Sequence, residues 1–494
     1  MRSIRIVVLL IMMSVMGFWA NAQTSLDFYS LENQFNSSNY NPAFLSSQDN
    51  FTLSIFPIGG TNIGYNNQEV IKQLLVKVIS GSSTDQDFKD MLKSMEEHSS
   101  IHQNIESNLL NFTIPSRLGV FNFRIKEVES FSAAFQGNLT DFIFRDGIQS
   151  AVTNQVQKLP AEGVHYREYS IGFSTVTGNN RLAVGIRAKL YFGKTGFFSE
   201  ISGNIIPNAK GEYVLTTDGM SRLSFPLSTT TGNGTVTELA SGLTGSNIIN
   251  YLMNSGNPGV GIDLGINYRI SPELTFSMSV IDLGKINWQT NLNSKSFKTK
   301  PGEYVIPSGS YVAANSNGSQ IITKTGNGSY IESVSDIFEL TPDASAFSKP
   351  MPINAYSGLK YQINPTLNIS IVDRYVILKD MNYNSFSMLA NLDVNNNLSL
   401  STGYSIIGNS YKNIPFAVLL KRKFGQMYLG TDNLLSFILP SMSDFAGFTF
   451  GTCFYLFKNR NLSRTVSDDY PFYSPRKNKK SKKTGLIKYD YPKF

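Results

Sequence analysis

The chain has 494 residues, of which 41% are hydrophobic and 12% aromatic but only 16% charged, and its formal net charge is +7. A single cysteine, Cys453, excludes an intramolecular disulfide framework and any metal cluster built from cysteines. Eight of the basic residues lie in residues 476–494 beside one acidic residue, so the basic character belongs to a tail, and the nearly neutral remainder excludes a nucleic-acid-binding body.

The first 22 residues have the pattern of a cleaved export signal. Arg2 and Arg5 supply positive charge, residues 6–19 are apolar, and residues 20–22 (Ala-Asn-Ala) have the small side chains that signal peptidase recognises. The apolar run is shorter than the ~20 residues that a membrane-spanning helix needs, which disfavours an uncleaved anchor. We therefore predict an exported protein whose mature chain begins at Gln23.

Residues 24–60 contain a turn and the first expected strand. Asn41-Pro42-Ala43-Phe44 is typical of a turn, because proline fixes the backbone torsion φ and asparagine caps the backbone. Apolar and polar residues then alternate over residues 51–55. This alternation predicts a strand that ends at the Pro-Ile-Gly-Gly sequence of residues 57–60.

Residues 69–108 change in character. Apolar residues such as Val70, Leu74, Met91 and Met95 recur at helical spacing. A lipid-facing barrel wall cannot contain such a helix, so we predict a helical insert that lies outside the membrane or inside the lumen. The insert is the expected plug or docking element.

Two arrangements of side chains could carry chemistry, and we favour a structural interpretation of both. His98, His102 and Glu106 would share one face of a helix, but no fourth metal ligand is evident, so we predict a solvated face and no metal site. The remaining histidine, His165, lies in a polar stretch where we expect it to be exposed, and no Gly-x-Ser-x-Gly elbow occurs. We therefore predict that the protein is not an enzyme and needs no cofactor.

A hairpin is expected across residues 169–192. In its second strand the apolar side chains share one face, whereas Arg187 and Lys189 share the other. The apolar face of a membrane barrel meets lipid. Both cations are therefore expected to line the lumen.

Residues 259–288 show the strongest strand pattern of the chain. Apolar and polar residues alternate over 262–270, a Ser-Pro-Glu turn follows at 271–273, and the alternation resumes over 274–280. Two amphipathic strands of about ten residues joined by a tight turn are the repeating unit of a transmembrane β-barrel.

The charged and aromatic residues of this hairpin have different expected positions. Asp263 and Arg269 fall on the polar face and are expected in the lumen, where a salt bridge between them or turn capping accounts for the carboxylate. Asp282 continues the apolar register and is expected at the membrane interface, so a paired acid–base role for the two aspartates fails. Trp288 is expected to be an interfacial anchor.

The C-terminal half should contain a long loop, several hairpins and a tail. Residues 289–352 are rich in serine, asparagine and glycine and predict a long extracellular loop, because the periplasmic turns of bacterial barrels are short. The barrel is expected to end at residue 457, with Cys453 as a small wall residue.

The tail, residues 458–494, should enter the periplasm, either disordered or bound to an anionic leaflet, cell-wall polymer or acidic partner. Its candidate binding residues are Arg476, Lys477, Lys479, Lys480, Lys482 and Lys483.

Three motifs resemble one group of bacterial barrels. Asn41-Pro42-Ala43 is similar to the start of Bacteroidota outer-membrane barrels of the PorV and PorP/SprF kind, which resemble the FadL fatty-acid channel in fold. The sequence Gly-Thr-Asp-Asn-Leu-Leu at 430–435 resembles the closing hairpin of that group. The repeated Ile-Asp-Leu-Gly at 262–265 and 281–284 is similar to the central hairpin of a Bacteroidota family of unknown function.

The resemblance implies a fold and two alternative functions. The fold is all-β: a FadL-like transmembrane antiparallel barrel of about 14 strands over residues 23–457, with short helical inserts, in the outer membrane. The first function is a non-enzymatic accessory or scaffold barrel for secretion, motility or surface assembly, associated with type IX secretion, in contact with outer-membrane lipid and with protein partners in the outer membrane or periplasm. The alternative is a FadL-like channel for small hydrophobic molecules, which requires an apolar pocket or a lateral gap in the wall.

Overall fold

The computed structural model describes most of the barrel and its N-terminal segment. No helix among the described residues is long and apolar enough to cross a membrane. The described residues are 26–66, 100–134, 157–177, 180–207, 213–224, 251–288, 346–377, 382–408, 410–439, 443 and 445–458, with short strands at 295–299, 303–306, 310–315, 318–323 and 338–342.

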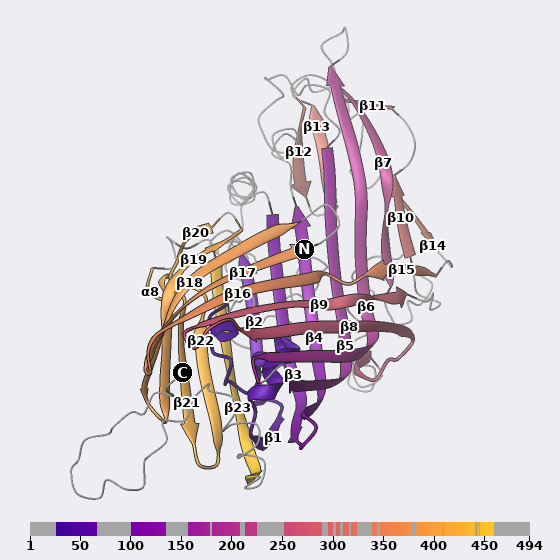
Figure 1. Ribbon diagram of the computed structural model, residues 1–494. Coiled ribbons are helices and arrows are strands. Elements are labelled where there is room, and N and C mark those ends of the chain that lie inside the picture. Colours follow the sequence, from indigo (N-terminus) through magenta and orange to yellow (C-terminus); the bar gives the residue numbers. More distant parts are fainter. Residues whose placement is uncertain are drawn as a thin grey trace, which may run out of the picture.

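Fourteen antiparallel strands form a closed wall (Figure 1), which confirms the predicted fold. They are β1 (Asn50–Ile55), β2 (Thr61–Asn66), β3 (Ser100–Pro115), β4 (Val120–Ala134), β5 (Gln157–Thr177), β6 (Leu182–Pro207), β8 (Asn257–Arg269), β9 (Leu274–Trp288), β15 (Phe347–Pro350), β16 (Ile353–Asn364), β17 (Leu367–Ile377), β18 (Tyr383–Asn395), β19 (Leu398–Ile407), β20 (Ser410–Asn413), β21 (Phe416–Arg422), β22 (Gly425–Thr431) and β23 (Phe445–Lys458). The count takes β1 with β2, β15 with β16, and β20 with β21 as single interrupted strands. The ring closes because β1 and β2 both pair with β3 on one side and with β23 on the other.

The wall strands alternate between a lipid-facing and a lumen-facing side. In β8 the apolar side chains of Leu264 and Ile266 are exposed on the outside, whereas Asp263 and Asn267 are buried on the inside. This is the pattern that a barrel with an apolar outer band requires. Exposed aromatic side chains lie near both ends of the wall, as interfacial girdles do: Tyr268, Tyr361 and Phe424 at one end and Tyr375, Tyr404 and Tyr411 at the other.

The two ends of the barrel differ in the length of their connections. At the end where β1 begins and β23 finishes, the turns are two to four residues long: 116–119, 178–181, 270–273, 365–366, 396–397 and 423–424. Longer connections lie at the opposite end. Because the periplasmic turns of bacterial barrels are short, we label the short-turn end periplasmic and the opposite end extracellular, in keeping with the orientation expected from the sequence.

A sheet extends the wall beyond its extracellular end (Figure 1). Above the start of β8, strand β6 pairs with β7 (Tyr213–Ser224), which also pairs with β10 (Lys295–Thr299) and β11 (Glu303–Ile306). Strand β14 (Phe338–Pro342) pairs with β10, and β12 (Ser310–Asn315) forms a separate hairpin with β13 (Gly318–Thr323). The segment predicted as one long loop therefore contains several short strands.

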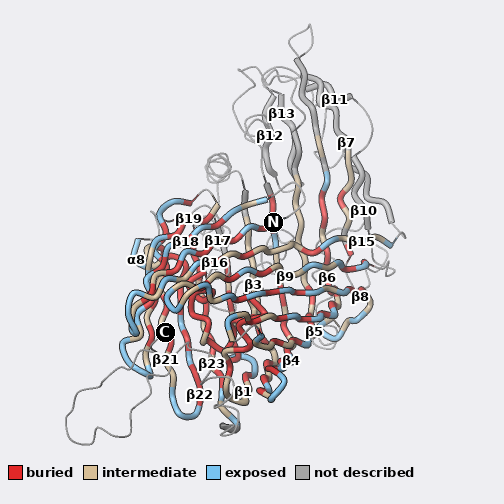
Figure 2. The backbone as a smooth tube through the Cα atoms, in the orientation of Figure 1, coloured by how far each residue is buried: buried red, intermediate tan, exposed pale blue. Residues whose placement is uncertain are grey.

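The N-terminal segment fills the lumen. It consists of α2 (Leu26–Ser30), η1 (Ser37–Asn39) and η2 (Pro42–Ser47), and all of residues 26–48 except Asn33, Asn39 and Ser47 are buried. We call residues 26–48 the plug. Figure 2 shows the buried residues gathered on the plug and on the wall around it.

The prediction of a helical insert over residues 69–108 is wrong for the part that the structure describes. Residues 100–108 belong to strand β3, and residues 67–99 lie outside the described residues. The spacing i, i+4 places two residues on one face of a helix, but it also places them on one face of a strand, so it does not distinguish the two. Along a strand, His102 and Glu106 are about 13 Å apart and cannot share a metal ion.

Candidate functional site

One side of the plug packs against an apolar part of the inner wall. Its aromatic rings, among them Phe28 and Tyr29, are at most 6% exposed. Phe28 contacts Tyr428 of β22 at 4.8 Å between ring centroids, and Tyr29 stacks on Tyr356 of β16 at 5.3 Å. Burial of each such ring contributes about 1.5–3 kcal/mol, so this side gives the plug most of its adhesion. The apolar wall residues in the cluster are Ile281, Tyr356, Val372, Leu389, Ala417, Leu419, Tyr428 and Cys453.

The Asn41-Pro42-Ala43 turn attaches the plug to β8 and β9. The Asn41 side chain accepts a hydrogen bond from the Ala43 amide at 2.9 Å, which fixes the turn. Its amide group donates to the Ile266 carbonyl at 3.0 Å and lies 3.4 Å from the Met278 carbonyl. The motif is therefore a turn, as predicted, and it also binds the backbone of the wall.

Two glycines of the wall make room for this turn. Gly185 of β6 and Gly265 of β8 are paired directly across the two strands. A Cβ atom on Gly265 would lie 2.0 Å from the Asn41 side-chain oxygen, and one on Gly185 would lie 2.2 Å from the Pro42 backbone. The glycine of the first Ile-Asp-Leu-Gly motif, Gly265, is thus explained by the close approach of the plug.

Replacing Gly185 by alanine should loosen the plug. The added methyl group meets backbone that cannot move aside without shifting the turn, so we expect a loss of about 1–3 kcal/mol in the free energy of unfolding. Urea titration of the refolded barrel measures this loss. Gly163→Ala is the matched control, because the nearest atom to its Cβ is a side-chain carbon at 3.3 Å. Equal stability of the two variants would contradict the close approach.

The opposite side of the lumen is lined by charged groups that we call the charge arc. Glu168 of β5 lies at its centre, 2.5 Å from Arg124, 3.8 Å from Lys126 and 3.4 Å from Lys189. Six consecutive wall strands contribute four cations and four carboxylates, which is why the arc is nearly neutral although it is buried. Its members are Glu106, Arg124, Lys126, Glu168, Arg187, Lys189, Asp263 and Asp282.

The charge arc holds the polar side of the plug. Arg187 donates to the Ser38 carbonyl at 2.7 Å and to the Ser38 hydroxyl at 3.0 Å. Arg124 donates to the Asn39 side-chain oxygen. Near the periplasmic end, Glu32 of the plug accepts from Asn267 at 3.0 Å and pairs with Lys360 of β16. The plug is thus amphipathic across the lumen, with aromatic contacts on one side and charge-assisted hydrogen bonds on the other.

Three of the four residues predicted to face the lumen lie in the charge arc. Arg187, Lys189 and Asp263 are each at most 3% exposed, and Asp263 lies 3.4 Å from Arg187 and 2.8 Å from Lys189. The predicted pair of Asp263 with Arg269 is wrong. Six residues of extended strand separate the two by about 20 Å, and Arg269 donates to the carbonyl oxygens of Ser271 and Pro272 at the periplasmic turn.

Asp282 points into the lumen, which corrects its expected position at the membrane interface. A β-bulge in β9 sets Ile281 and Asp282 against the single residue Asp263, and Asp282 has a φ of 65°. The extra residue reverses the inside–outside alternation from this point onward. Asp282 consequently accepts hydrogen bonds from Lys189 at 2.6 Å and Tyr191 at 3.0 Å.

The same bulge turns Trp288 inward, so the predicted interfacial anchor is also wrong. Trp288 is 1% exposed and packs against Phe198 of β6 and Phe347 of β15. A Cβ on Gly193 would lie 2.8 Å from the indole, which shows how closely the ring lies against β6. The cluster around it lines the extracellular end of the lumen: Val128, Tyr166, Tyr191, Phe198, Ile286, Trp288 and Met351.

Trp288 should report this burial directly by its fluorescence. The chain has two tryptophans, and Trp19 lies in the predicted signal peptide, so Trp288 is the expected single emitter of the mature protein. We expect blue-shifted emission that neither aqueous iodide nor brominated lipid quenches strongly. Strong quenching by brominated lipid would instead place the ring at the membrane interface.

The motif at residues 430–435 fixes the start of the plug and the rim of the wall. Asp432 accepts a hydrogen bond from the Leu26 amide at 3.1 Å. Asn433 joins two strands, because its side chain accepts from the Ile414 amide at 3.2 Å and donates to the Phe445 carbonyl at 3.0 Å. All three motifs used for the family resemblance therefore contact the plug directly or lie at its attachment points.

Burial affects one carboxyl group of the plug strongly. Asp27 of α2 is fully buried, and burial raises the pKa of its carboxyl group to about 7. One of its oxygens accepts from the Phe28 amide at 3.0 Å. Near neutral pH this carboxyl group is therefore held partly in its uncharged form, which lowers the cost of placing it in the lumen.

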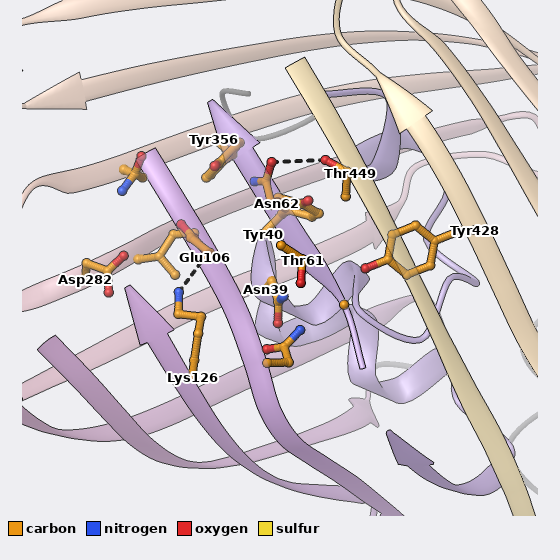
Figure 3. Close-up of a pocket in the computed structure, with 14 residues that line it drawn as sticks. Asn39, Tyr40, Thr61, Asn62, Glu106, Lys126, Asp282, Tyr356, Tyr428 and Thr449 are labelled. Atoms are coloured by element: carbon orange, nitrogen blue, oxygen red, sulfur yellow. Dashed lines mark hydrogen bonds and ion pairs between the residues drawn. The ribbon is translucent and has the colours of Figure 1, made fainter. Parts of the chain in front are cut away.

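A small polar cavity remains between the plug and the wall (Figure 3). Asn39 and Tyr40 of the plug, Asn62 of β2, and Glu106 and Lys126 of the charge arc are among its lining residues. Its volume of about 30 Å³ holds about two water molecules, whereas a cavity of about 150 Å³ accommodates benzene. In the described part of the chain, the lumen is closed around the plug.

Of the remaining predicted features, the structure describes His165 but neither the signal peptide nor the tail. His165 contacts Glu127 at 2.9 Å and Tyr251 at 2.5 Å in an ion-pair cluster at the extracellular end of the wall, rather than lying free in solvent. The signal peptide and the tail beyond residue 458, with its six candidate basic residues, lie outside the described residues.

The plug is the functional element that sequence reasoning missed. Residues 24–45 have neither helical nor strand periodicity, so pattern methods assign them no position. A signal was nevertheless present: several aromatic residues and an Asn-Pro-Ala turn directly after an export signal and before the first strand. Such a segment has no place in the wall and is too apolar for a solvated tail.

Comparisons with known proteins give a family and a set of distant structures. The protein-family model described as "Family of unknown function (DUF5723)" matches residues 42–432 of the chain. A search of curated proteins found no match. Among solved structures, the toluene transporter TodX of P. putida is 11% identical with a TM-score of 0.36, and the match covers 89% of this chain and 94% of that one. The Ralstonia pickettii toluene transporter TbuX is 9% identical with a TM-score of 0.35 and the same coverage. A Pseudomonas aeruginosa FadL homologue is 9% identical with a TM-score of 0.34, covering 85% and 93%. Similarity at this level transfers no ligand to this chain.

Proposed function

The chain belongs to the DUF5723 family, whose function is unknown, and from this premise we propose that it is a non-enzymatic outer-membrane channel for small hydrophobic molecules, closed by its own N-terminal plug. The proposal uses the second of the two functions that the sequence suggested. The orientation of the barrel in the membrane follows from the short periplasmic turns. Molecules would therefore enter from the extracellular end, where the aromatic cluster around Trp288 lines the lumen.

One observation carries the proposal: the plug's own aromatic rings occupy an apolar inner surface of the wall. Tyr356, Val372, Leu389, Leu419 and Tyr428 face Phe28, Tyr29, Phe35 and Phe44 of the plug. If the plug shifts, these wall residues become one side of a pocket whose other side is the charge arc. Ligand pockets for small molecules have this composition, with mostly apolar walls and a few placed polar groups.

The polar attachment of the plug also favours a movable element. A lumen that never opens would gain more from apolar filling, because a buried ion network costs desolvation free energy that its own attraction only offsets. Charged groups such as Arg187, which hold the plug through hydrogen bonds, remain well solvated if water replaces the plug. The charge arc is therefore suited to both a closed and an open lumen.

A reversible lock on the plug tests the proposal. The Ser30 hydroxyl of α2 lies 2.9 Å from the Asn391 side-chain oxygen of β18, so Ser30→Cys with Asn391→Cys can join plug and wall, and Cys453→Ala removes the native thiol. In intact cells that carry the protein in their outer membrane, uptake of a small apolar dye should fall on oxidation and recover on reduction. The Ser30→Cys single variant is the control. Equal uptake by cells with and without the reduced protein would contradict the channel function.

A second candidate function, a scaffold for secretion, motility or surface assembly, is favoured by the extracellular sheet. Strands β7, β10, β11 and β14 extend the wall beyond the membrane and offer a surface that transport through the lumen does not require. Cross-linking mass spectrometry on intact outer membranes should then join a stoichiometric partner to residues 295–342. Absence of such a partner at native abundance, with the barrel intact, would rule against the scaffold.

A further inference from the structure

An apolar turn lies at the extracellular rim of the wall, between β22 and β23. It contains the short helix α8 (Leu435–Ile438), visible at the flank of the barrel in Figure 1. Three consecutive side chains project outward: Phe437 is 51% exposed, Ile438 62% and Leu439 45%. Exposed adjacent apolar side chains of this size mark a contact surface rather than a solvated loop.

The turn is held firmly to the wall. Asn433 accepts from the Leu435 amide at 3.1 Å, and the Ser436 hydroxyl donates to the Asn433 carbonyl at 2.7 Å. The Leu434 amide donates to the Ile414 carbonyl at 2.7 Å. The exposed side chains are therefore presented by a fixed backbone.

The exposed side chains continue the lipid-facing surface. The ring of Phe437 contacts that of Phe448 on β23 at 6.3 Å between centroids. Below them, the outer face of the two strands carries the exposed apolar side chains Met427, Leu429 and Phe454. The turn thus caps an apolar surface that already meets acyl chains.

The wall at this point is too short to cover the apolar band alone. Strand β22 has seven residues. Seven residues at about 3.4 Å each, tilted by about 40°, rise roughly 18 Å, whereas the apolar band of outer-membrane barrels is about 25 Å tall. The periplasmic limit is set by the basic residues Arg422 and Lys423 beside the 423–424 turn, so the deficit lies at the extracellular end, where α8 is.

We propose that Phe437, Ile438 and Leu439 insert into the acyl-chain region of the outer leaflet and complete the lipid-facing band where β22 ends. The partner of these three side chains is therefore the lipid bilayer. The proposal is independent of what passes through the lumen. It assigns to the 434–439 turn an anchoring role that fixes the depth of the barrel on its shorter side.

Fluorescence quenching in lipid vesicles tests this contact. Phe437→Trp in a Trp288→Phe background places a single emitter at the turn. Leu429→Trp on the lipid face of β22 is the lipid control, and Asn396→Trp on the exposed periplasmic turn is the aqueous control. Resistance to heat in gel electrophoresis verifies that each variant is folded.

We expect brominated lipid to quench the Phe437→Trp emission to the same extent as that of Leu429→Trp, with little quenching by iodide. Quenching by iodide at the level of Asn396→Trp, and none by brominated lipid, would overturn the proposal. If iodide quenches in pure vesicles but not in native outer membranes, a protein covers the turn, and the lipid assignment is likewise overturned.

Discussion

Removal of residues 26–48 should turn a closed barrel into a conducting pore. The wall strands close on themselves without help from the plug, and their inner face is rich in serine, threonine, asparagine and charged groups that water can solvate. In planar bilayers we expect the deletion variant to conduct ions at least on the order of tenfold better than the intact protein, because the buried residues of the plug occupy the lumen in the part of the chain that the structure describes.

The deletion also exposes the apolar inner wall, so a milder variant serves as its control. Phe28→Ala with Phe44→Ala removes two rings that are each at most 1% exposed, and each truncation should cost about 3–5 kcal/mol of plug packing. Such a plug should open intermittently and give brief conductance events. If both variants assemble and neither conducts more than the intact protein, residues 26–48 do not close the lumen.

Neutralising Glu168 should destabilise the barrel strongly, because its carboxylate faces three buried cations. Glu168→Gln keeps the size of a side chain that is 0% exposed but removes the charge facing Arg124, Lys126 and Lys189. Three buried cations then share fewer carboxylates. Breaking a buried ion network in this way costs about 3–5 kcal/mol in the free energy of unfolding.

Urea titration of the barrel in lipid vesicles measures this loss. Glu273→Gln makes the same chemical change at an exposed periplasmic turn and should alter stability by less than about 0.5 kcal/mol. A loss below about 1 kcal/mol for Glu168→Gln would mean that the charge arc is hydrated, and its description as a buried network would fail.

The fold could be predicted from the sequence because alternation is a local signal. The outward and inward faces of β8 follow the predicted pattern, as do the cations of β6. The errors in β9 have one cause. A single extra residue at Asp282 reverses the alternation, which a simple two-residue period does not include, so the pattern predicts the wrong face for both Asp282 and Trp288.

The plug could not be placed by the same reasoning, because its structure depends on contacts with distant residues. Asn41 binds the carbonyl of Ile266, and Asp432 binds the amide of Leu26. Neither contact leaves a periodic trace near residues 26–48. A second clue, besides the aromatic residues and the Asn-Pro-Ala turn, was glycine placement: Gly185 and Gly265 interrupt amphipathic strands, as glycines do where another backbone approaches closely.

The family resemblance gains a physical meaning from these contacts. Its motifs were read as a turn, a repeated carboxylate and a closing hairpin. In the structure they are the Asn41 turn, Gly265 beside that turn with two carboxylates of the charge arc, and the Asp432 attachment point, all of which position the plug. The three motifs therefore lie where the plug meets the wall.

The central claim, that residues 26–48 lie inside the barrel, is tested most directly by a cross-link in the native outer membrane. With Cys453→Ala as background, mild oxidation should join Ser30→Cys to Asn391→Cys, and mass spectrometry should identify the disulfide-linked peptides. Ser30→Cys with Asn396→Cys at the periplasmic turn should remain unlinked. Linkage of the control pair in place of the first pair would contradict the account and place the segment in the periplasm.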